Sequence, residues 1–258
     1  MKYESLFARY YDYLAHDRRE ALATDEDISF LRHAFSTRCA IAVHEILDAG
    51  CGTGRYLIPL ASAGFRLTGI DNSPEMISQC RARLKKRKLR ADLVEADLMQ
   101  LAESDAYDAL LCMDSALCYS LEGRDIARVL TLFEHALRPG GLLVLEIFNA
   151  PMPAAPAGET RNREMRDGNL TIEVTERERY DPVLSLRHLT VEAAVADGGQ
   201  KYVFSHEEVL KVMTAAEVTE HLENAGFEDI SCELRRDTLA PESGDVNMVF
   251  LAVKGSGS

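Results

Sequence analysis

Residues Ile46 to Arg55 read ILDAGCGTGR, and this stretch decides the fold. It places three glycines within ten residues, directly after the apolar run of a buried strand. Glycine-rich turns that follow strands allow the backbone to approach a nucleotide closely. The stretch therefore predicts a strand, a tight turn and a nucleotide site at the carboxyl end of that strand.

Strand and helix signals alternate along the first 150 residues. Strands separated by helices indicate βαβ units and a parallel sheet. Right-handed crossovers then place a ligand at the carboxyl ends of the strands. The expected strands are HEILDAG, RLTGIDN, ADLVEAD, YDALLCMD and LLVLEIF, and helices are expected over 4–37, over 55–63, from Pro74 after a Ser73 cap, and over 126–137 before RPGG.

The alternation breaks at NAPMPAAPAGET, whose three prolines indicate a linker. Strands of alternating polarity then predict an antiparallel meander over about residues 155–212, before a helix in TAAEVTEHLENAGF and strands in EDISCELRR and NMVFLAVKG resume the first pattern. The prediction is an α/β fold with flanking helices and an inserted antiparallel β lid. Its parts are cap helices over 1–38, a ligand-binding core over 39–150, the lid over 151–212, completion of the core over 213–254 and a tail over 255–258.

Composition excludes several classes of protein. The net charge of −13 disfavours a nucleic-acid substrate, because an acidic surface repels phosphates. The basic cluster Arg81 to Arg90 is interpreted as the solvated face of a helix. Six scattered cysteines form no C-x-x-C pair, so we expect no metal and a reducing, cytoplasmic location. No apolar run approaches eighteen residues, so we expect no membrane span.

The glycine spacing and its flanking acid narrow the choice of nucleotide. Gly50, Gly52 and Gly54 are spaced G-x-G-x-G, whereas the dinucleotide fingerprint wants a glycine at position 55, where this chain has Arg55. The G-K-[ST] of a phosphate P-loop is also missing. Asp48 would repel a pyrophosphate, but it suits a ligand that carries an ammonium and a sulfonium. S-adenosylmethionine (SAM) carries both.

Two more acids follow at strand ends. Asp71 ends the second expected strand, where a carboxylate can accept hydrogen bonds from both ribose hydroxyls. NAD and SAM share that need, so Asp71 alone does not discriminate. Asp97 ends the third expected strand, where it can accept a hydrogen bond from the adenine amino group.

Five stretches follow one another in this order: ILDAGCGTGR, GIDNSPEMI, ADLVEADL, YDALLCMDSALCY and LRPGGLLVLEIFN. Together they resemble class I SAM-dependent methyltransferases over residues 40–150, and the resemblance continues more loosely over 213–254. The resemblance implies a Rossmann-like, seven-stranded, mostly parallel sheet with one antiparallel strand. It also implies SAM as cofactor, S-adenosylhomocysteine as product, no metal and a small-molecule acceptor. The insertion resembles the strand-rich lid of amino-sugar and glycine-type N-methyltransferases, which implies methylation of an amine nitrogen.

The resemblance also implies which residues hold the cofactor. The glycines contact the methionine part and ribose, Asn72 and Met76 flank the adenine, and Leu98 joins Asp97 at the adenine edge. LFARYYDYLAHDRR resembles a cap helix with a Tyr-Asp pair that closes over the cofactor. The full expected cofactor set is Tyr11, Asp48, Ala49, Gly50, Cys51, Gly52, Gly54, Asp71, Asn72, Met76, Asp97, Leu98, Met113 and Ser115.

Four residues are candidates for catalysis, each with a plainer alternative. Asp114 could orient or deprotonate an amine, or cap a loop. Tyr119 faces the substrate or packs in the core, and Tyr11 closes over the cofactor or packs an amphipathic helix. His206, near the end of the expected lid, is a base or a surface histidine.

Other functions stay open at this point. One alternative is an O-methyltransferase acting on a small hydroxylated metabolite. Another is an NAD-type oxidoreductase, which Arg55 and Asp48 disfavour. A third is a SAM-binding protein with a non-methylating role. The N-P-P-[YF] motif typical of planar-amide or exocyclic-amine methylation is missing, and so is the Pro-Cys pair of cytosine C5 methylation. An exposed lid edge would suit a homodimer.

Overall fold

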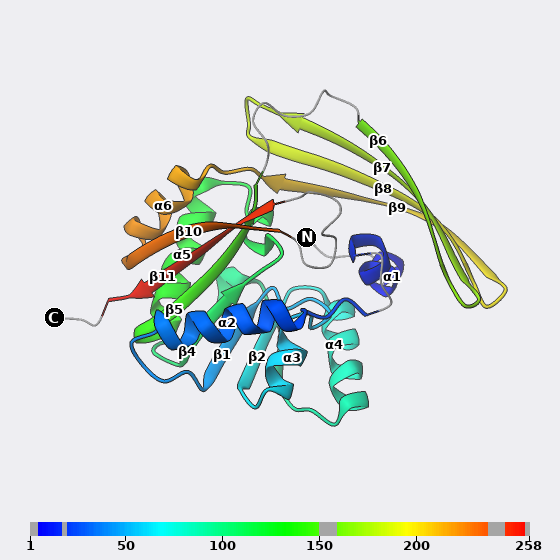
Figure 1. Cartoon of the computed structure of the whole chain (residues 1–258). Helices are drawn as coiled ribbons and strands as arrows, with labels where there is room; N and C mark the ends of the chain where they lie inside the picture. Colours follow the sequence, from blue (N-terminus) through cyan, green and yellow to red (C-terminus); the bar gives the residue numbers. More distant parts are fainter. Residues whose placement is uncertain (1–4, 17–19, 150–158, 237–245, 256–258) are drawn as a thin grey trace.

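The structure, a computed structural model, describes residues 5–16, 20–149, 159–236 and 246–255. Most of the predicted linker and the last three residues of the predicted tail lie outside the described residues. Within them, the strands form two sheets, one of seven strands and one of four. Figure 1 shows the four-stranded sheet projecting from one side of the seven-stranded core.

The seven-stranded sheet has the order β10-β11-β5-β4-β1-β2-β3. β1 pairs parallel with β2 and β4, and the parallel pairing continues to β3 and β5. β11 is antiparallel to both neighbours, which confirms the mostly parallel sheet. The strands are β1 Glu45–Ala49, β2 Arg66–Asp71, β3 Asp92–Glu95, β4 Tyr107–Cys112, β5 Leu137–Phe148, β10 Phe227–Arg236 and β11 Val246–Lys254.

Helices cover both faces of this sheet (Figure 1). Alternate residues of β1 show the two cores, because Ile46 packs with α2, α3 and α4, whereas Leu47 packs with α5 and α6. Ser73 caps α4 as predicted, accepting from the Met76 N–H at 3.3 Å. The helices are α2 Asp25–Thr37, α3 Leu57–Ser62, α4 Pro74–Arg87, α5 Gly123–Ala136 and α6 Ala215–Asn224, with short 3₁₀ turns η1 Leu98–Gln100 and η2 Ala116–Tyr119.

The four-stranded sheet, hereafter the lid, is an antiparallel meander in the order β6-β7-β8-β9. Helix α1 (Ser5–His16) packs on one of its faces, where Phe7, Tyr10 and Leu14 join lid residues in a third apolar cluster. The first strand was not predicted, because ETRNREMRD contains almost no apolar residue to alternate with. The strands are β6 Glu159–Asp167, β7 Leu170–Asp181, β8 Leu186–Asp197 and β9 Gln200–Lys211.

Two predicted boundaries differ from the structure. The RPGG stretch does not separate helix from strand, because β5 begins at Leu137 and contains RPGG. Gly140 has φ +80°, and pairing with β4 shifts register there, so the glycines form an irregularity within the strand. The N-terminal helical region is two helices, and α2 begins anew at a capping box on Thr24.

Candidate functional site

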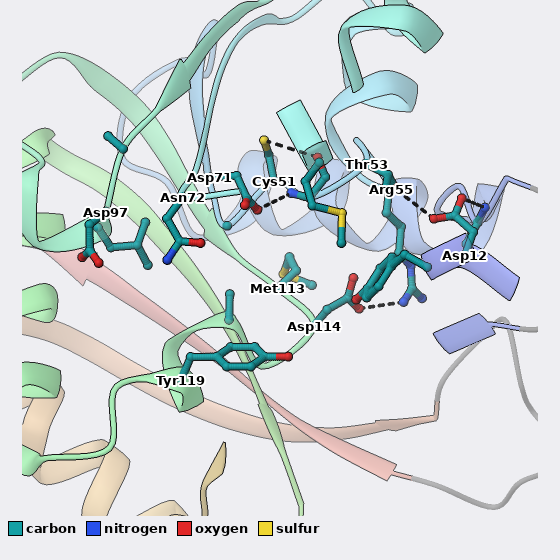
Figure 2. A pocket seen from close by; sticks show the side chains of 18 of the residues that line it. Asp12, Cys51, Thr53, Arg55, Asp71, Asn72, Asp97, Met113, Asp114 and Tyr119 are labelled. Atoms are coloured by element: carbon teal, nitrogen blue, oxygen red, sulfur yellow. Dashed lines mark hydrogen bonds and ion pairs between the residues drawn. The ribbon is translucent and has the colours of Figure 1, made fainter. Parts of the chain in front are cut away.

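A first cavity opens at the carboxyl ends of β1, β2 and β4, and residues of α1 also line it (Figure 2). This is the edge that the sequence predicted for the ligand. Both the glycine turn and the acidic strand ends contribute to its wall. Its lining is Tyr11, Asp12, His16, Ala21, Gly50, Cys51, Gly52, Thr53, Arg55, Asp71, Asn72, Met76, Ala96, Asp97, Leu98, Met113, Asp114, Ala116, Tyr119 and Ser120.

The glycine turn is shaped by left-handed backbone. Gly50 has φ +81°, and a Cβ there would lie 2.6 Å from the Cβ of Ala116. At Gly52, with φ +51°, an added Cβ would meet no atom within 4 Å, so the space before it belongs to the cavity. Gly54 does not line the cavity; its added Cβ would meet Cys80 and Ile58. Gly52 therefore lets a ligand approach, whereas Gly50 makes room for η2 and Gly54 makes room for α3 and α4.

Asp71 lies where β2 ends and both of its carboxylate oxygens accept backbone hydrogen bonds. The Gly52 N–H donates to Oδ2 and the Ser73 N–H donates to Oδ1, each at 2.9 Å. Burial raises the pKa of Asp71, and the two backbone donors oppose that rise. Because each carboxylate oxygen has two lone pairs, both can still accept from a ribose diol.

Asp97 lies at the far end of the cavity in Figure 2 and has an exposed side chain. Its Oδ1 accepts from the Met99 N–H at 2.8 Å and caps η1. Asn72, Met76 and Leu98 line the same end of the cavity. This grouping fits an adenine.

Asp48 and Ala49 lie behind the cavity rather than in its wall. Asp48 is buried, and burial, together with the nearby Asp114 and Asp71 carboxylates, raises its pKa to about 8. A carboxyl with that pKa is largely neutral near pH 7, which weakens the predicted attraction for a cationic ligand.

Asp12 is a buried residue of the site that the sequence interpretation did not single out. Its Oδ1 accepts from the Thr53 hydroxyl at 2.9 Å, and its Oδ2 accepts from the Ala21 N–H at 2.7 Å. Arg83 forms an ion pair with the same carboxylate at 2.8 Å. The basic cluster was thus wrongly interpreted at Arg83, whose side chain is only 11% exposed. The signal was available, because Asp12 directly follows Tyr11 in the expected Tyr-Asp pair.

Arg55, which replaces the fingerprint glycine, makes an ion pair with Asp114 at 2.6 Å (Figure 2). Asp114 has φ +51° and Ser115 has φ +58°, so two successive non-glycine residues are left-handed after β4. Glu146 of β5 accepts from the Asp114 N–H at 3.4 Å and from the Asn247 amide at 2.5 Å. Burial raises the pKa of Glu146 to about 7, with a further contribution from Asp114.

A second and larger cavity, of about 700 Å³, lies between the lid, α1 and the core. It is rich in charge of both signs. Arg163 pairs with Glu176 at 2.7 Å, and Arg187 pairs with Glu178 at 2.8 Å. Its lining is Phe7, Tyr11, Leu14, Ala15, His16, Arg55, Asp114, Ser115, Tyr119, Phe148, Arg161, Asn162, Arg163, Glu176, Glu178, Arg187, Leu189, Val191, Glu208, Leu210 and Asn247.

The two cavities meet at shared residues. Three of the four predicted catalytic residues, Tyr11, Asp114 and Tyr119, line both. Ser115, predicted for the cofactor, lines the second cavity alone. His206 lines neither, and its buried ring stacks on Phe7 with centroids 3.8 Å apart. The alternative of a surface histidine is therefore wrong.

The sequence interpretation missed the charged wall of the second cavity. Period-two alternation along β9 turns Glu208 and Leu210 to the same face as His206, so Glu208 could have been found from the same stretch. Arg163 and Glu176 come from the unpredicted β6 and from β7, and only strand pairing reveals their contact.

Two features are absent from the described residues. Across 5–16, 20–149, 159–236 and 246–255, no group of three or more His, Cys, Asp or Glu side chains is placed to hold a metal. In the same part of the chain, no helix has the length and apolarity needed to cross a bilayer.

Comparison with known sequences finds similarity to methyltransferases over part of the chain. Residues 46–141 match a family described as "Methyltransferase domain". A putative methyltransferase of Geobacillus sp. strain WCH70 is 27% identical over 57% of this chain and 58% of its own length. A glycine/sarcosine N-methyltransferase of Halorhodospira halochloris is 32% identical over 39% of this chain and 38% of its own length. A ubiquinone biosynthesis O-methyltransferase of Methylocella silvestris is 36% identical over 40% of this chain and 40% of its own length. The chain thus spans from about two fifths to just under three fifths of these curated relatives.

Comparison with solved structures extends the likeness to the lid. A SAM-dependent methyltransferase from Clostridium acetobutylicum superposes with a TM-score of 0.77 at 17% identity, covering 97% of this chain and 98% of that one. The SAM-bound amino pentose methyltransferase CalS10 from Micromonospora echinaspora gives 0.74 at 20% identity, covering 98% of each. The resemblance inferred from the sequence is confirmed, because residues 46–141 match a methyltransferase-domain family and the chain has the fold of the SAM-dependent methyltransferases compared above.

Proposed function

We propose that this protein, a methyltransferase domain with a strand-built lid, transfers the methyl group of SAM to an amine nitrogen of a small acceptor. The observation that carries the proposal is the junction of the two cavities. The first fits SAM, the second is large enough for an acceptor, and they share Tyr11, His16, Arg55, Asp114 and Tyr119. Transfer between two ligands needs such a shared wall.

The residues of the first cavity fit the cofactor. Asp71 would accept from the ribose hydroxyls, and Asp97 with Leu98 would meet the adenine. The turn at Gly50 and Gly52 would lie against the methionine part and ribose, with Tyr11 as a cover from α1 and Met113 nearby. When bound, SAM supplies a methyl group already activated by its sulfonium, with S-adenosylhomocysteine as product.

The chain's own contribution is to position the acceptor. Holding a nucleophile close and in line with the reacting carbon supplies roughly 7–11 kcal/mol of the barrier. The ion pair with Arg55 fixes the Asp114 carboxylate at the junction, where it can accept a hydrogen bond from an ammonium or amine. Tyr119 lies beside it (Figure 2) and presents a hydroxyl group to both cavities.

The carboxylates of the second cavity favour an amine over a neutral hydroxyl acceptor. Asp114 and Glu208 line it, and carboxylates pair well with an ammonium group. The glycine/sarcosine N-methyltransferase relative and CalS10 support the same class. The O-methyltransferase relative supports the second candidate, a small hydroxylated metabolite. A nucleic-acid acceptor is disfavoured by the net charge of −13.

Calorimetric titration with SAM, S-adenosylhomocysteine and NADH, side by side, tests the proposal first. We expect the first two to bind and NADH not to bind. Transfer of a labelled methyl group to amine and hydroxyl acceptors then separates the two candidates. Binding of NADH alone, or of none of the three to cofactor-free protein, contradicts the proposal.

A further inference from the structure

Glu208 of β9 lies in the second cavity, where the acceptor would bind. The sequence predicted no catalytic or cofactor-binding role for it. It lines the second cavity although its side chain is only 11% exposed. A buried carboxyl at the wall of a ligand cavity is expensive unless it is paired or used. Its surroundings therefore decide what it can do.

The groups that face Glu208 come from four elements. The hydroxyl of Tyr119, on η2, is hydrogen-bonded to the carboxyl. Arg187 of β8 lowers the pKa of Glu208 and Glu176 of β7 raises it, while on β9 itself the His206 Nε2 lies 3.7 Å from Oε1. Burial outweighs these, and the pKa of Glu208 is raised above its ordinary value. A raised pKa makes a carboxylate a stronger base.

The other candidate bases are less suited to removing a proton. The Asp114 carboxylate is held in an ion pair with Arg55 at 2.6 Å, so one of its oxygens is already engaged. His206 is stacked on Phe7 and lines neither cavity. Glu208 combines a position in the acceptor cavity with a hydrogen bond to Tyr119, which reaches the junction of the two cavities.

We propose that Glu208 is the general base of this site and takes the proton from an acceptor that binds as an ammonium ion. The inference rests on the proposed function. An N–H bond of the ammonium breaks, its proton goes to a carboxylate oxygen of Glu208, and the electron pair stays on nitrogen. The freed pair forms the new bond to the methyl carbon, and the proton leaves to solvent after the product departs. The acceptor class is therefore alkyl amines that bind in the protonated form.

Glu208→Gln is the variant that tests this role, because glutamine keeps the shape and can still accept from Tyr119. Glu207→Gln is the matched control, since Glu207 is the adjacent residue and is exposed on the opposite face of the lid. The acceptor probes are glycine, ethanolamine and trans-2-aminocyclohexanol, assayed with labelled SAM between pH 6.5 and 9.5. Calorimetry with S-adenosylhomocysteine checks the cofactor site of each variant.

The pH profile separates a base from a structural residue. Alkyl amines have pKa values of roughly 10, so an enzyme without a base must use the small free-amine fraction, which grows tenfold per pH unit. We expect Glu208→Gln to lose about 10²–10⁴-fold in kcat/KM near pH 7, and the loss to shrink steadily toward pH 9.5. Glu207→Gln should match the unaltered protein, and all three proteins should bind S-adenosylhomocysteine equally.

Each other outcome has a definite meaning. If Glu208→Gln is as active as the unaltered protein, or loses the same factor at every pH, Glu208 is not the base, while the proposed function stands. If the unaltered protein binds SAM but methylates none of the three probes, the amine acceptor itself is refuted, and the role of Glu208 with it. If SAM does not bind, the proposed function fails before the acceptor is reached.

Discussion

The carboxylate of Asp12 on α1 accepts a hydrogen bond from the hydroxyl of Thr53 in the glycine turn, at 2.9 Å and across 41 residues of sequence. It connects the helix that covers the first cavity to the turn that forms its floor. On its opposite side α1 holds the lid, because the Tyr10 hydroxyl donates to Asp197 at 3.0 Å and Tyr13 donates to Asp167 at 2.5 Å. One short helix therefore joins the glycine turn to the lid.

Asp12→Ala should weaken SAM binding about tenfold or more and lower the melting temperature. The change leaves the largely buried Arg83 without its carboxylate, and removing one partner of a buried pair costs about 3–5 kcal/mol. Titration calorimetry and thermal denaturation measure the two effects. Glu26→Gln, at an exposed position on α2, is the control. Unchanged SAM affinity in Asp12→Ala would show that α1 does not support the cofactor turn.

Asp71→Ala should abolish measurable SAM binding. The ribose loses a charged acceptor, worth about 1.5–3 kcal/mol, and the Gly52 and Ser73 N–H groups lose theirs as well. Asp71→Asn should lose less, because its amide oxygen still accepts. The exposed Asp92 on β3 provides the control Asp92→Asn. Normal SAM affinity in both Asp71 variants would show that the ribose does not bind at the end of β2.

Gly50→Ala should impair both folding stability and SAM binding. Its φ of +81° strains any side chain, and the new Cβ would lie 2.6 Å from Ala116. Overpacking of this kind costs about 1–3 kcal/mol beyond the strain. Gly64→Ala is the matched control, because φ is +96° there but nothing lies within 4 Å of the added Cβ. Equal urea-unfolding curves for the two variants would argue against the contact with Ala116.

Asp114→Asn should lower turnover by roughly 10–100-fold while sparing SAM affinity. The acceptor loses the negative charge that orients its nitrogen, whereas asparagine still offers an oxygen to Arg55. Initial rates and SAM titration give the two numbers. Full turnover of Asp114→Asn would show that Asp114 only caps the loop and does not act on the acceptor.

Glu146→Gln should flatten the dependence of stability on pH. The pKa of Glu146 is raised by burial from 4.5 to about 7, so the folded state holds a proton that the unfolded state releases. The free energy of unfolding of the unaltered protein should therefore fall as pH rises from about 4.5 to 7. Asp48, with its pKa raised to about 8, should continue the fall to that pH in both proteins. Urea unfolding at pH 5, 6, 7 and 8 tests this, and identical slopes below pH 7 would contradict it.

The sequence predicted the parts of this fold that local pattern governs. The G-x-G-x-G turn, the Ser73 cap and the acids at strand ends lie where expected, because strand ends meet at one edge of a parallel sheet. β6 escaped prediction because its polar sequence is held by pairing with β7 rather than by an apolar face of its own. The ion pair of Arg83 with Asp12 escaped prediction because it joins distant segments. Glu208 was missed although the alternation of β9 places it on the same face as His206.

Several expectations stay predictions. The division of the chain into five parts, the cytoplasmic location and a homodimer through the lid are among them. Acceptor identity also lies beyond sequence reasoning, because the second cavity is built from α1, the lid and the junction residues, which share no local motif.

The lid strands come from one uninterrupted segment, Glu159 to Lys211, placed between β5 and α6. The glycine turn and the acidic strand ends lie outside this segment, so one contiguous stretch supplies the lid strands and no residue that lines the first cavity. A transplant that exchanges acceptor preference between relatives must carry Ser5–His16 together with the lid, since that helix fills the lid's apolar face. A graft of the lid alone would pack its apolar face against a helix from another protein, whose side chains would not match that face.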